Sequence, residues 1–227
     1  MTKNLLALIV AGGLALGCGV SMASAQDTKH TGGTPAAQPG KEGKKDKEMK
    51  TDGAKVGEKA PAFSLTDTDG KTVTLADFTK EKKIVVIEWF NPECPYVKKH
   101  YENGASTMTD TAKAFKDKNV VWVRIATNIS KDDLAAAKKN WKLDGHILQD
   151  TDGKVAGAYG SKNTPTMFII NADGVLAYRG AIDDDNTPEK PGKTNYVKNA
   201  LEQIVKGETV TTPETKAYGC RVKGPKA

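Results

Sequence analysis

The stretch from residue 82 to residue 95, KKIVVIEWFNPECP, constrains the fold more than any other part of the chain. It opens with a near-continuous apolar run, as expected for a buried central strand. Proline is favoured in the first turn of a helix, so we predict a helix from Pro95. The Cys94 sulfur then lies at a helix N-terminus, where unpaired N–H groups and the helix dipole favour a thiolate. Cys94 is therefore a candidate reactive thiol; the alternative is a structural cysteine that packs as a small apolar side chain.

The other patterns alternate between strands and helices. Residues 61–75 predict two short strands around a turn, and a helix over 131–141 has Ser130 or Asp132 as its N-cap. Further elements are expected at 119–127 (strand), 146–150 (strand), 153–160 (short helix), 164–182 (strand, Asp-Gly turn, strand) and 195–208 (helix). This order predicts an α/β fold with parallel strand pairs, completed by an antiparallel hairpin and a last helix.

The first 25 residues have the pattern of a secretory signal peptide. Lys3 precedes an apolar run over residues 5–16, and Ala-Ser-Ala at 23–25 forms a cleavage site. The apolar run is too short for a comfortable membrane span. A rival interpretation is lipid attachment at Cys18, but alanine stands where lipoprotein sites usually carry leucine. We expect ordinary cleavage and a periplasmic or extracellular protein without a membrane span.

Residues 26–55 contain no valine, isoleucine, leucine or aromatic residue. Such a segment cannot bury enough apolar surface to offset its ordering entropy, so we predict a flexible linker. Its lysines are interleaved with acidic residues and lack aromatic neighbours for base stacking. The net charge of +6 therefore does not indicate nucleic-acid binding. Residues 56–210 suffice for one domain, and 211–227 form a C-terminal tail.

Four sequence blocks resemble the redoxins, which include the peroxiredoxins. Residues 56–65, VGEKAPAFSL, resemble the start of redoxin domains in general. Residues 88–101, EWFNPECPYVKKHY, residues 164–184 and YGCRVK at 218–223 resemble one branch, the peroxiredoxin-like redoxins. The resemblance implies a thioredoxin-like α/β fold with a peroxiredoxin-type N-terminal hairpin. It also implies thiol–disulfide chemistry without a cofactor.

Asn91 departs from the thioredoxin pattern, in which a cysteine at this position completes a C-x-x-C pair. Cys94 therefore has no local disulfide partner, and Asn91 is expected to be a turn or N-cap residue. Peroxiredoxins carry threonine or serine here, a proline four residues earlier and an arginine from a later strand. The matching positions hold Asn91, Ile87 and Pro165.

Two arginines are candidates to replace the one that peroxiredoxins use. Arg124 and Arg179 both lie in predicted strands, and each is more simply interpreted as a surface residue at a strand end. The groups that polarise a peroxide bond are thus absent as a set, and efficient peroxidase activity is not expected.

Thr164 and Pro165 match the cis-proline loop of thioredoxin-like proteins. In that fold the loop faces the reactive cysteine and offers backbone groups to an extended peptide or mixed-disulfide partner. The alternative is an ordinary trans proline at the start of an edge strand. The resemblance implies a docking surface for a thiol or disulfide partner at Thr164 and Pro165, with Asn91 and Pro95 beside Cys94.

Glu88 interrupts the apolar strand, where an isolated carboxylate is costly to bury. It is a candidate proton donor or acceptor for Cys94, with a raised pKa. The alternative is an ion pair with a strand neighbour such as Arg124. Both interpretations stay open.

The histidines raise the question of a metal site. His100 follows Cys94 by six residues, which is about 240° around a helix, so the two side chains do not share a face. His146 begins a predicted strand. We therefore expect no metal site.

Cys220 lies in a tail that has no secondary-structure signal of its own. After signal removal it and Cys94 are the only cysteines, and an unpaired thiol in an oxidising compartment tends to oxidise. The resemblance to the G-C motif that ends this branch implies that Cys220 is the partner of Cys94.

The sequence therefore predicts an exported thiol–disulfide redox protein with Cys94 as reactive thiol and Cys220 as its resolving or disulfide partner. Glu88 is a third candidate catalytic residue. One alternative is a thiol peroxidase that uses the same cysteines. Another is a non-catalytic binding module with a structural Cys94–Cys220 disulfide, and metal delivery is a third.

Overall fold

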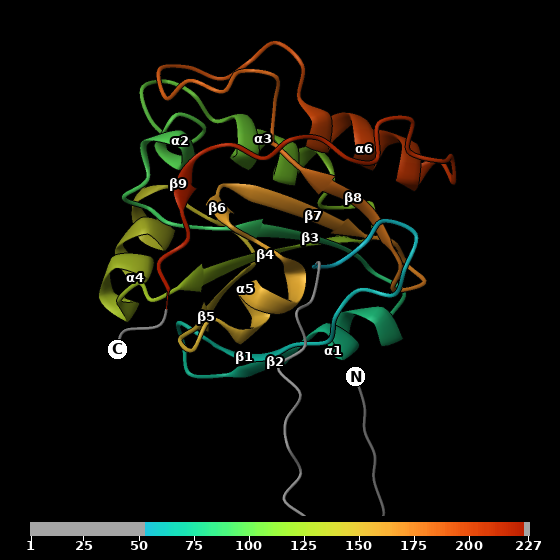
Figure 1. The fold of residues 1–227 in the computed structure, drawn as a ribbon, viewed down its shortest axis with the longest axis horizontal. Helices are drawn as coiled ribbons and strands as arrows, with labels where there is room; N and C mark the ends of the chain where they lie inside the picture. Colours follow the sequence, from blue (N-terminus) through green and yellow to red (C-terminus); the bar gives the residue numbers. More distant parts are fainter. Residues whose placement is uncertain (1–52, 225–227) are drawn as a thin grey trace, which may run out of the picture. The chain divides into compact units, whose positions relative to one another are not determined.

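The computed structural model describes residues 53–224 (Figure 1). The predicted signal peptide, the lipid-attachment candidate Cys18 and residues 26–52 of the predicted linker lie outside the described residues. Ala54 is buried, its N–H donates to Tyr159 O at 3.3 Å, and its carbonyl accepts from Arg179 at 2.7 Å. The packed part of the chain thus includes the last residues of the predicted linker.

A seven-stranded sheet forms the centre of the domain, in the order β2-β1-β5-β4-β3-β7-β8. The strands are β1 (Ser64–Asp67), β2 (Thr72–Thr74), β3 (Ile84–Trp89), β4 (Val120–Thr127), β5 (His146–Asp150), β7 (Thr166–Ile170) and β8 (Leu176–Gly180). β3, β4 and β5 run parallel, whereas β1, β2, β7 and β8 join through antiparallel pairs. Every residue of β3 is buried, as its apolar run predicts.

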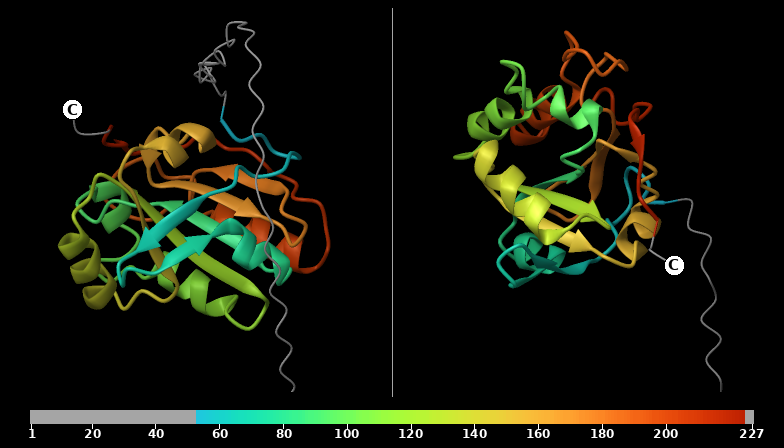
Figure 2. Two further views of the ribbon diagram at one scale, coloured as in Figure 1. Left: turned by 90° about the horizontal axis from the view of Figure 1, so that it is seen from below. Right: turned by 90° about the vertical axis from the view of Figure 1, so that its left-hand side faces the viewer.

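Helices cover both faces of the sheet (Figure 2). They are α1 (Leu75–Lys80), α2 (Pro95–Lys98), α3 (Thr107–Ala114), α4 (Lys131–Asn140), α5 (Lys154–Tyr159) and α6 (Tyr196–Val205). Because side chains alternate along a strand, Val86 packs with residues of α2, α3, α4 and α6, whereas Val85 and Ile87 pack with α1 and α5. Glu88 belongs to the face of Val86, which is also the face of Cys94.

The predicted α/β order is confirmed, including the hairpin of β1 and β2, the hairpin of β7 and β8, and the last helix. Ser130 is the N-cap of α4 and accepts from Asp133 N at 3.1 Å. Two helices were not predicted, α1 and α3. α1 begins with a reciprocal capping box between Thr74 and Asp77, in which each side chain accepts from the other residue's N–H.

The C-terminal tail has a strand that its sequence did not indicate. β9 (Cys220–Arg221) pairs antiparallel with β6 (Asn163–Thr164), and the two form a separate two-stranded sheet. In Figure 1 the tail runs from α6 across the domain to β9, beside β6.

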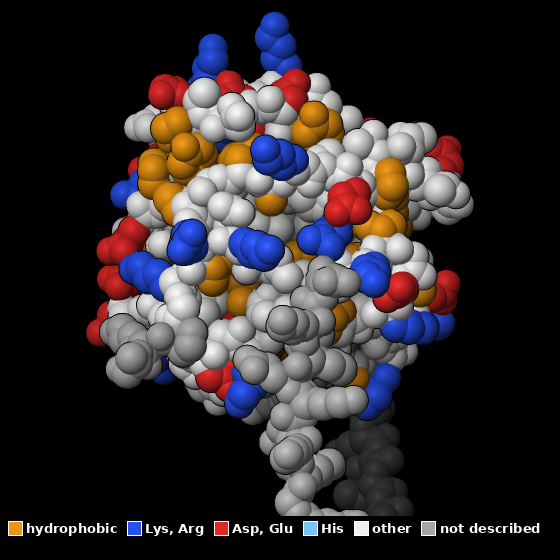
Figure 3. Space-filling view, in the orientation of Figure 1, with side chains coloured by type: hydrophobic (Ala, Val, Ile, Leu, Met, Phe, Trp, Pro, Cys, Tyr) orange, Lys and Arg blue, Asp and Glu red, His pale blue; other side chains and the backbone are white. Residues whose placement is uncertain are grey.

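Within residues 53–224, no helix is long and apolar enough to cross a membrane. On the face shown in Figure 3, lysine and arginine side chains lie scattered among neutral and acidic ones.

Candidate functional site

The structure brings Cys94 and Cys220 into contact. Their sulfurs are 2.7 Å apart, compared with about 2.05 Å in a disulfide bond. Both are free thiols in this structure. Cys94 is 1% exposed and Cys220 is partly buried, so the pair lies at the edge of the core. Only a small movement separates the two thiols from a bonded disulfide.

Strand pairing carries the tail to this position. Cys220 is the partner of Thr164 in the β6–β9 pair, and the Thr164–Pro165 bond is cis, as the resemblance implies. The Cys94 thiol donates to the Thr164 carbonyl at 3.0 Å. The structure therefore joins the candidate reactive thiol, the candidate docking loop and the tail cysteine in one site.

The local structure at Cys94 follows from the sequence around it. Cys94 is the N-cap of α2 and Pro95 its first residue, as predicted, although α2 is only four residues long. So short a helix has a small dipole, and the Cys94 side chain makes no capping hydrogen bond. Asn91 is a turn residue whose Oδ1 accepts from Glu93 N at 2.9 Å. Pro95 is exposed beside the thiol pair.

The surroundings of Cys220 keep its thiol protonated. Burial, assisted by the hydrogen bond and the charge of Cys94, raises the pKa of Cys220 to about 12. At neutral pH Cys220 is therefore a thiol and not the first attacking thiolate.

Glu88 is fully buried and paired. Its Oε2 accepts from Tyr101 Oη at 2.6 Å and from Trp122 Nε1 at 3.4 Å, and lies 3.4 Å from Arg124 Nε. Oε1 has no hydrogen-bond partner among the described residues. Burial raises the pKa of Glu88, and Arg124, Tyr101 and Trp122 oppose that rise.

The structure therefore contains the ion pair that was one of the two interpretations of Glu88. Within residues 53–224, no hydrogen bond or ion pair joins Glu88 to Cys94, although both belong to one face of the sheet. A proton-carrying role for Glu88 stays a prediction.

The interpretation of Arg124 as a surface residue is wrong. Arg124 is 1% exposed, because its parallel register places it opposite Glu88 in the middle of the sheet. Its Nη1 also donates to Asp144 O at 2.8 Å. Arg179 is partly exposed and lies 3.6 Å from Glu214 in an ion pair with the tail.

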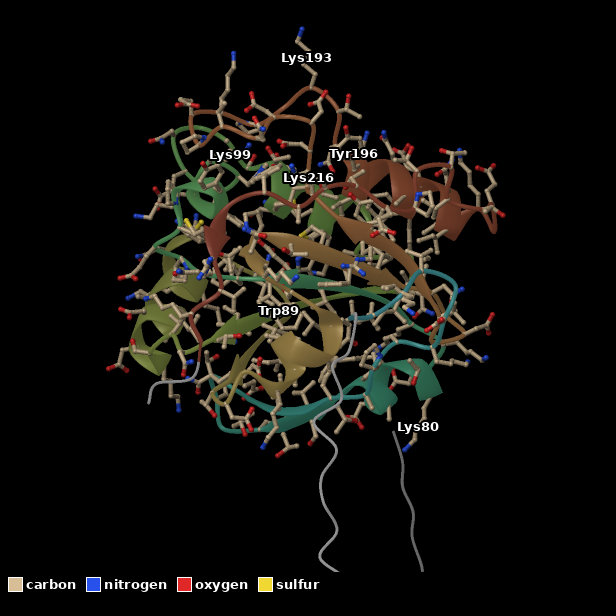
Figure 4. The ribbon with its side chains drawn as sticks, viewed as in Figure 1. Lys80, Trp89, Lys99, Lys193, Tyr196 and Lys216 are labelled. Atoms are coloured by element: carbon tan, nitrogen blue, oxygen red, sulfur yellow. The ribbon has the colours of Figure 1, made fainter. Side chains whose placement is uncertain are left out.

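A buried polar cluster next to the thiol pair was missed by the sequence analysis. Lys99, His100 and Asp183 are each at most 3% exposed. Together they surround Tyr218, two residues before Cys220, and we call these three residues the tail anchor. Tyr218 donates a hydrogen bond to Asp183, and Lys99 Nζ lies 4.6 Å from the centre of its ring. Figure 4 labels Lys99 at the end of α2 and Lys216 on the tail.

The tail anchor has little local sequence signal, because its residues come from two separate segments and lysine and aspartate are usually exposed. Asp183 Oδ1 is 3.5 Å from Lys99 Nζ, and its Oδ2 accepts from Gly192 N at 2.6 Å. His100 Nε2 is 3.4 Å from the Tyr218 hydroxyl. These three residues and Tyr218 all lie in blocks that resemble the redoxin branch, but nothing in those blocks indicates that their side chains meet.

The two histidines considered for a metal site lie apart in the fold. His100 belongs to the tail anchor, whereas His146 packs on Phe78 with ring centres 5.4 Å apart. Among residues 53–224, no group of three histidine, cysteine or acidic side chains is placed to hold a metal ion. A groove of about 550 Å³ lined by Ile84, Leu176 and Ile204 includes neither cysteine.

Known proteins resemble this chain in sequence and in fold. The thiol-disulfide oxidoreductase ResA of Bacillus subtilis is 30% identical over 146 residues, which cover 61% of this chain and 78% of that protein. A protein of Mycobacterium tuberculosis assigned to the peroxiredoxins is 29% identical over 137 residues, which cover 57% of this chain and 78% of that protein.

The thioredoxin domain of a thiol-disulfide oxidoreductase from Bacteroides vulgatus has a similar structure. It superimposes with a TM-score of 0.52 over 66% of this chain and 98% of that domain, at 20% identity. This similarity establishes the thioredoxin-like fold. Residues 56–179, more than half of the chain, match the AhpC/TSA family. The chain therefore belongs to the AhpC/TSA family.

Proposed function

We propose that this protein is an exported thiol–disulfide oxidoreductase whose redox couple is Cys94 and Cys220. The observation that carries the proposal is the 2.7 Å contact between the two sulfurs, next to the cis Thr164–Pro165 bond. The similarity to ResA, a thiol-disulfide oxidoreductase, supports the reaction class. Export is supported by the pattern of residues 1–25.

The proposed reaction has two steps of thiol–disulfide exchange. The Cys94 thiolate attacks one sulfur of a partner disulfide, forms a mixed disulfide and releases one partner sulfur as thiolate. Cys220 then attacks the Cys94 sulfur of the mixed disulfide, which releases the second partner sulfur and leaves a Cys94–Cys220 disulfide. The partner gains two electrons and two protons, and the protein dithiol loses them.

Proton supply follows from the pKa of about 12 at Cys220, which keeps that thiol protonated at neutral pH. Cys220 therefore gives up its proton only as it attacks, and the departing partner thiolate is the acceptor. Cys94 acts first because its neighbour can donate a hydrogen bond to the thiolate. Glu88, whose pKa burial raises, is proposed to take up the proton that Cys94 loses and to return it to the first partner thiolate released.

The experiment tests the couple in the full chain. We expect a Cys94–Cys220 disulfide in oxidised protein by mass spectrometry, and its loss and return as glutathione redox buffers are varied. Cys220→Ser is expected to accumulate mixed disulfides on Cys94, whereas Cys18→Ser, the matched control, should equilibrate like the wild type. Thiols at Cys94 and Cys220 that can both be alkylated under oxidising conditions would contradict the proposal.

The peroxidase alternative is favoured by the similarity to the peroxiredoxin-assigned relative. Stopped-flow mixing with hydrogen peroxide separates the two functions, because a peroxidase forms a sulfenic acid on Cys94 rapidly. A Cys94–Cys220 disulfide that resists mild thiol reductants would instead indicate a structural staple.

A further inference from the structure

The tail binds the domain as a short extended peptide beside the cis-proline. Among the strands of residues 53–224, β9 pairs only with β6, outside the seven-stranded sheet. Three contacts fix its register: the Thr164–Cys220 pairing, Asn163 Nδ2 donating to Gly219 O at 3.0 Å, and Val222 N donating to Lys162 O at 2.9 Å. These contacts use the backbone edge that an external strand would need. The tail is therefore the resident occupant of a peptide site.

The position before the cysteine has no room for a side chain. Gly219 has φ = +117°, a conformation that residues with a side chain rarely adopt. A Cβ atom there would lie 2.1 Å from Thr164 O, 2.8 Å from Thr164 C and 3.2 Å from Pro165 Cδ. Two of these atoms are backbone and the third is a proline ring atom, so they cannot rotate aside. A strand in this register therefore needs glycine directly before its cysteine.

The side chain two residues before the cysteine contacts the tail anchor. The Tyr218 hydroxyl meets Asp183 and lies 3.4 Å from His100 Nε2, while the ring lies over Lys99. Lys99 and Asp183 are almost completely buried, where unpaired charges are costly. An aromatic side chain with a hydroxyl group covers these charges and satisfies them. An aliphatic side chain would cover them without a hydrogen bond.

We infer that the edge beside Pro165 selects partner polypeptides that carry tyrosine, glycine and cysteine in succession, as the tail itself does at residues 218–220. The inference rests on the proposed function and adds the substrate class: an extended Tyr-Gly-Cys segment whose cysteine is in a disulfide. Such a segment replaces β9, makes the same backbone hydrogen bonds and brings its sulfur to Cys94. Segments with a side chain in the glycine position are excluded by Thr164 O.

The reaction at this site balances as a single exchange. The Cys94 thiolate attacks the sulfur of the docked segment, the segment's former disulfide partner leaves as a thiolate, and one mixed disulfide replaces the original disulfide. No external oxidant or reductant is needed for this step.

The test uses the full chain with Cys18→Ser and Cys220→Ser, so that Cys94 is the only thiol. Three heptapeptides are prepared as mixed disulfides with thionitrobenzoate: Ala-Tyr-Gly-Cys-Arg-Val-Lys, which is residues 217–223, and two variants with alanine in place of glycine or of tyrosine. The release of thionitrobenzoate gives the rate, and mass spectrometry identifies the protein–peptide disulfide. Rates with glutathione instead of the protein correct for the intrinsic reactivity of each peptide.

After this correction, the Tyr-Gly-Cys peptide is expected to react at least about ten-fold faster than either variant, the equivalent of one lost favourable contact. If the protein reacts faster than glutathione but at the same corrected rate with all three peptides, the inference is overturned and the proposed function is left intact. If the protein reacts with none of the peptides faster than glutathione does, both fail.

A second pair of variants addresses competition from the resident tail. Adding Gly219→Ala loosens the tail and is expected to raise the rate with the Tyr-Gly-Cys peptide while keeping the ranking of the three peptides. Adding Gly224→Ala is the matched control, because a Cβ there meets nothing within 4 Å and should leave the rates unchanged. A Gly219→Ala rate equal to the control would mean that the tail and the peptide do not share a site, which also overturns the inference.

Discussion

Glu88 combines a charge, complete burial and a carboxyl oxygen without a partner among the described residues. Because burial raises its pKa, the folded protein binds a proton at Glu88 more tightly than the unfolded chain does. The stability contributed by this group is therefore present below the unfolded pKa of 4.5 and lost as pH rises through the raised value. The contribution of Glu88 to the free energy of unfolding thus falls with rising pH, opposite to the usual behaviour of carboxylates.

We expect Glu88→Gln to remove this slope, since glutamine keeps the size and the acceptor oxygen but does not titrate. The variant should lose less stability than the wild type between pH 5 and pH 8. Urea unfolding at both pH values measures the difference, and Glu93→Gln, a change at an exposed carboxylate, is the control. Identical slopes for Glu88→Gln and the wild type would contradict the prediction.

Single residues were predictable where the chain itself carries the cause. Cys94 and Pro95 follow from a buried strand that runs directly into a proline-initiated helix, and Asn91 follows from turn chemistry. Arg124 was misplaced because its burial depends on the parallel register with Glu88, which no local pattern encodes. The tail anchor was missed because lysine and aspartate are exposed in most proteins and no local pattern brings Asp183 to Lys99 and His100.

At the scale of elements, the tail anchor links α2, the loop after β8 and the tail through one buried imidazole. Burial lowers the pKa of His100 to about 4, and Lys99 adds to this effect, while Asp183 opposes it. Although His100 Nε2 lies 3.8 Å from Asp183 Oδ2, Asp183 is already engaged by Lys99, Tyr218 and Gly192. Burial therefore prevails, and the imidazole is neutral.

This neutral imidazole makes the docking of the tail sensitive to acid. The unfolded chain binds a proton at His100 near pH 6.5 but the folded one only near pH 4, so stability is complete above pH 6.5 and falls as pH decreases through this window. The full loss is on the order of 3 kcal/mol. We expect His100→Gln to remove this part of the acid destabilisation, measured by urea unfolding at pH 7 and pH 4.5.

His146→Gln is the control for this measurement. Burial also lowers the pKa of His146, but its side chain is only half-buried, so a smaller change in slope is expected. If His100→Gln and the wild type lose the same stability on acidification, the imidazole of His100 is not neutral in the folded protein.

Elements were predictable in proportion to their length and periodicity. The long buried strands and α6 follow from apolar patterns, whereas α1 has six residues and depends on its capping box. β6 and β9 have two residues each, and a pair so short has no pattern of its own. Its position depends on contacts between residues far apart in the chain, such as Asn163 with Gly219, which are 56 positions apart.

At the scale of the whole molecule, alternating strands and helices were enough to predict the class of fold. The order of the strands, and the position of the tail beside the cis-proline, required more than periodicity. The pairing of Cys94 with Cys220 was implied by the resemblance of the YGC block to the end of one redoxin branch, and by the absence of any other cysteine after signal removal. A tail without apolar periodicity can still be positioned by a few backbone hydrogen bonds and one tyrosine.

The proximity of the two thiols connects the redox potential with the stability of the fold. In the unfolded chain, a disulfide between residues 126 positions apart closes a long loop, which costs chain entropy of about 4–5 kcal/mol. In the folded, reduced protein the tail is already docked and the sulfurs are in contact. The entropy of closing the loop has therefore already been lost on folding. The disulfide is therefore easier to form in the folded protein, by about the same free energy.

Because folding and oxidation form a closed thermodynamic cycle, the same free energy must be found in two measurements. With the Cys18→Ser chain, the oxidised form should be more stable than the reduced form by about 4–5 kcal/mol in urea unfolding. The reduction potential of the couple should be about 100 mV more negative in buffer than in concentrated urea, since 30 mV corresponds to about 1.4 kcal/mol. Equal potentials in both solvents, together with equal unfolding free energies, would mean that the tail is not docked in the reduced protein. A difference in only one of the two measurements would break the cycle, and would show that an intermediate with a detached tail is populated during unfolding.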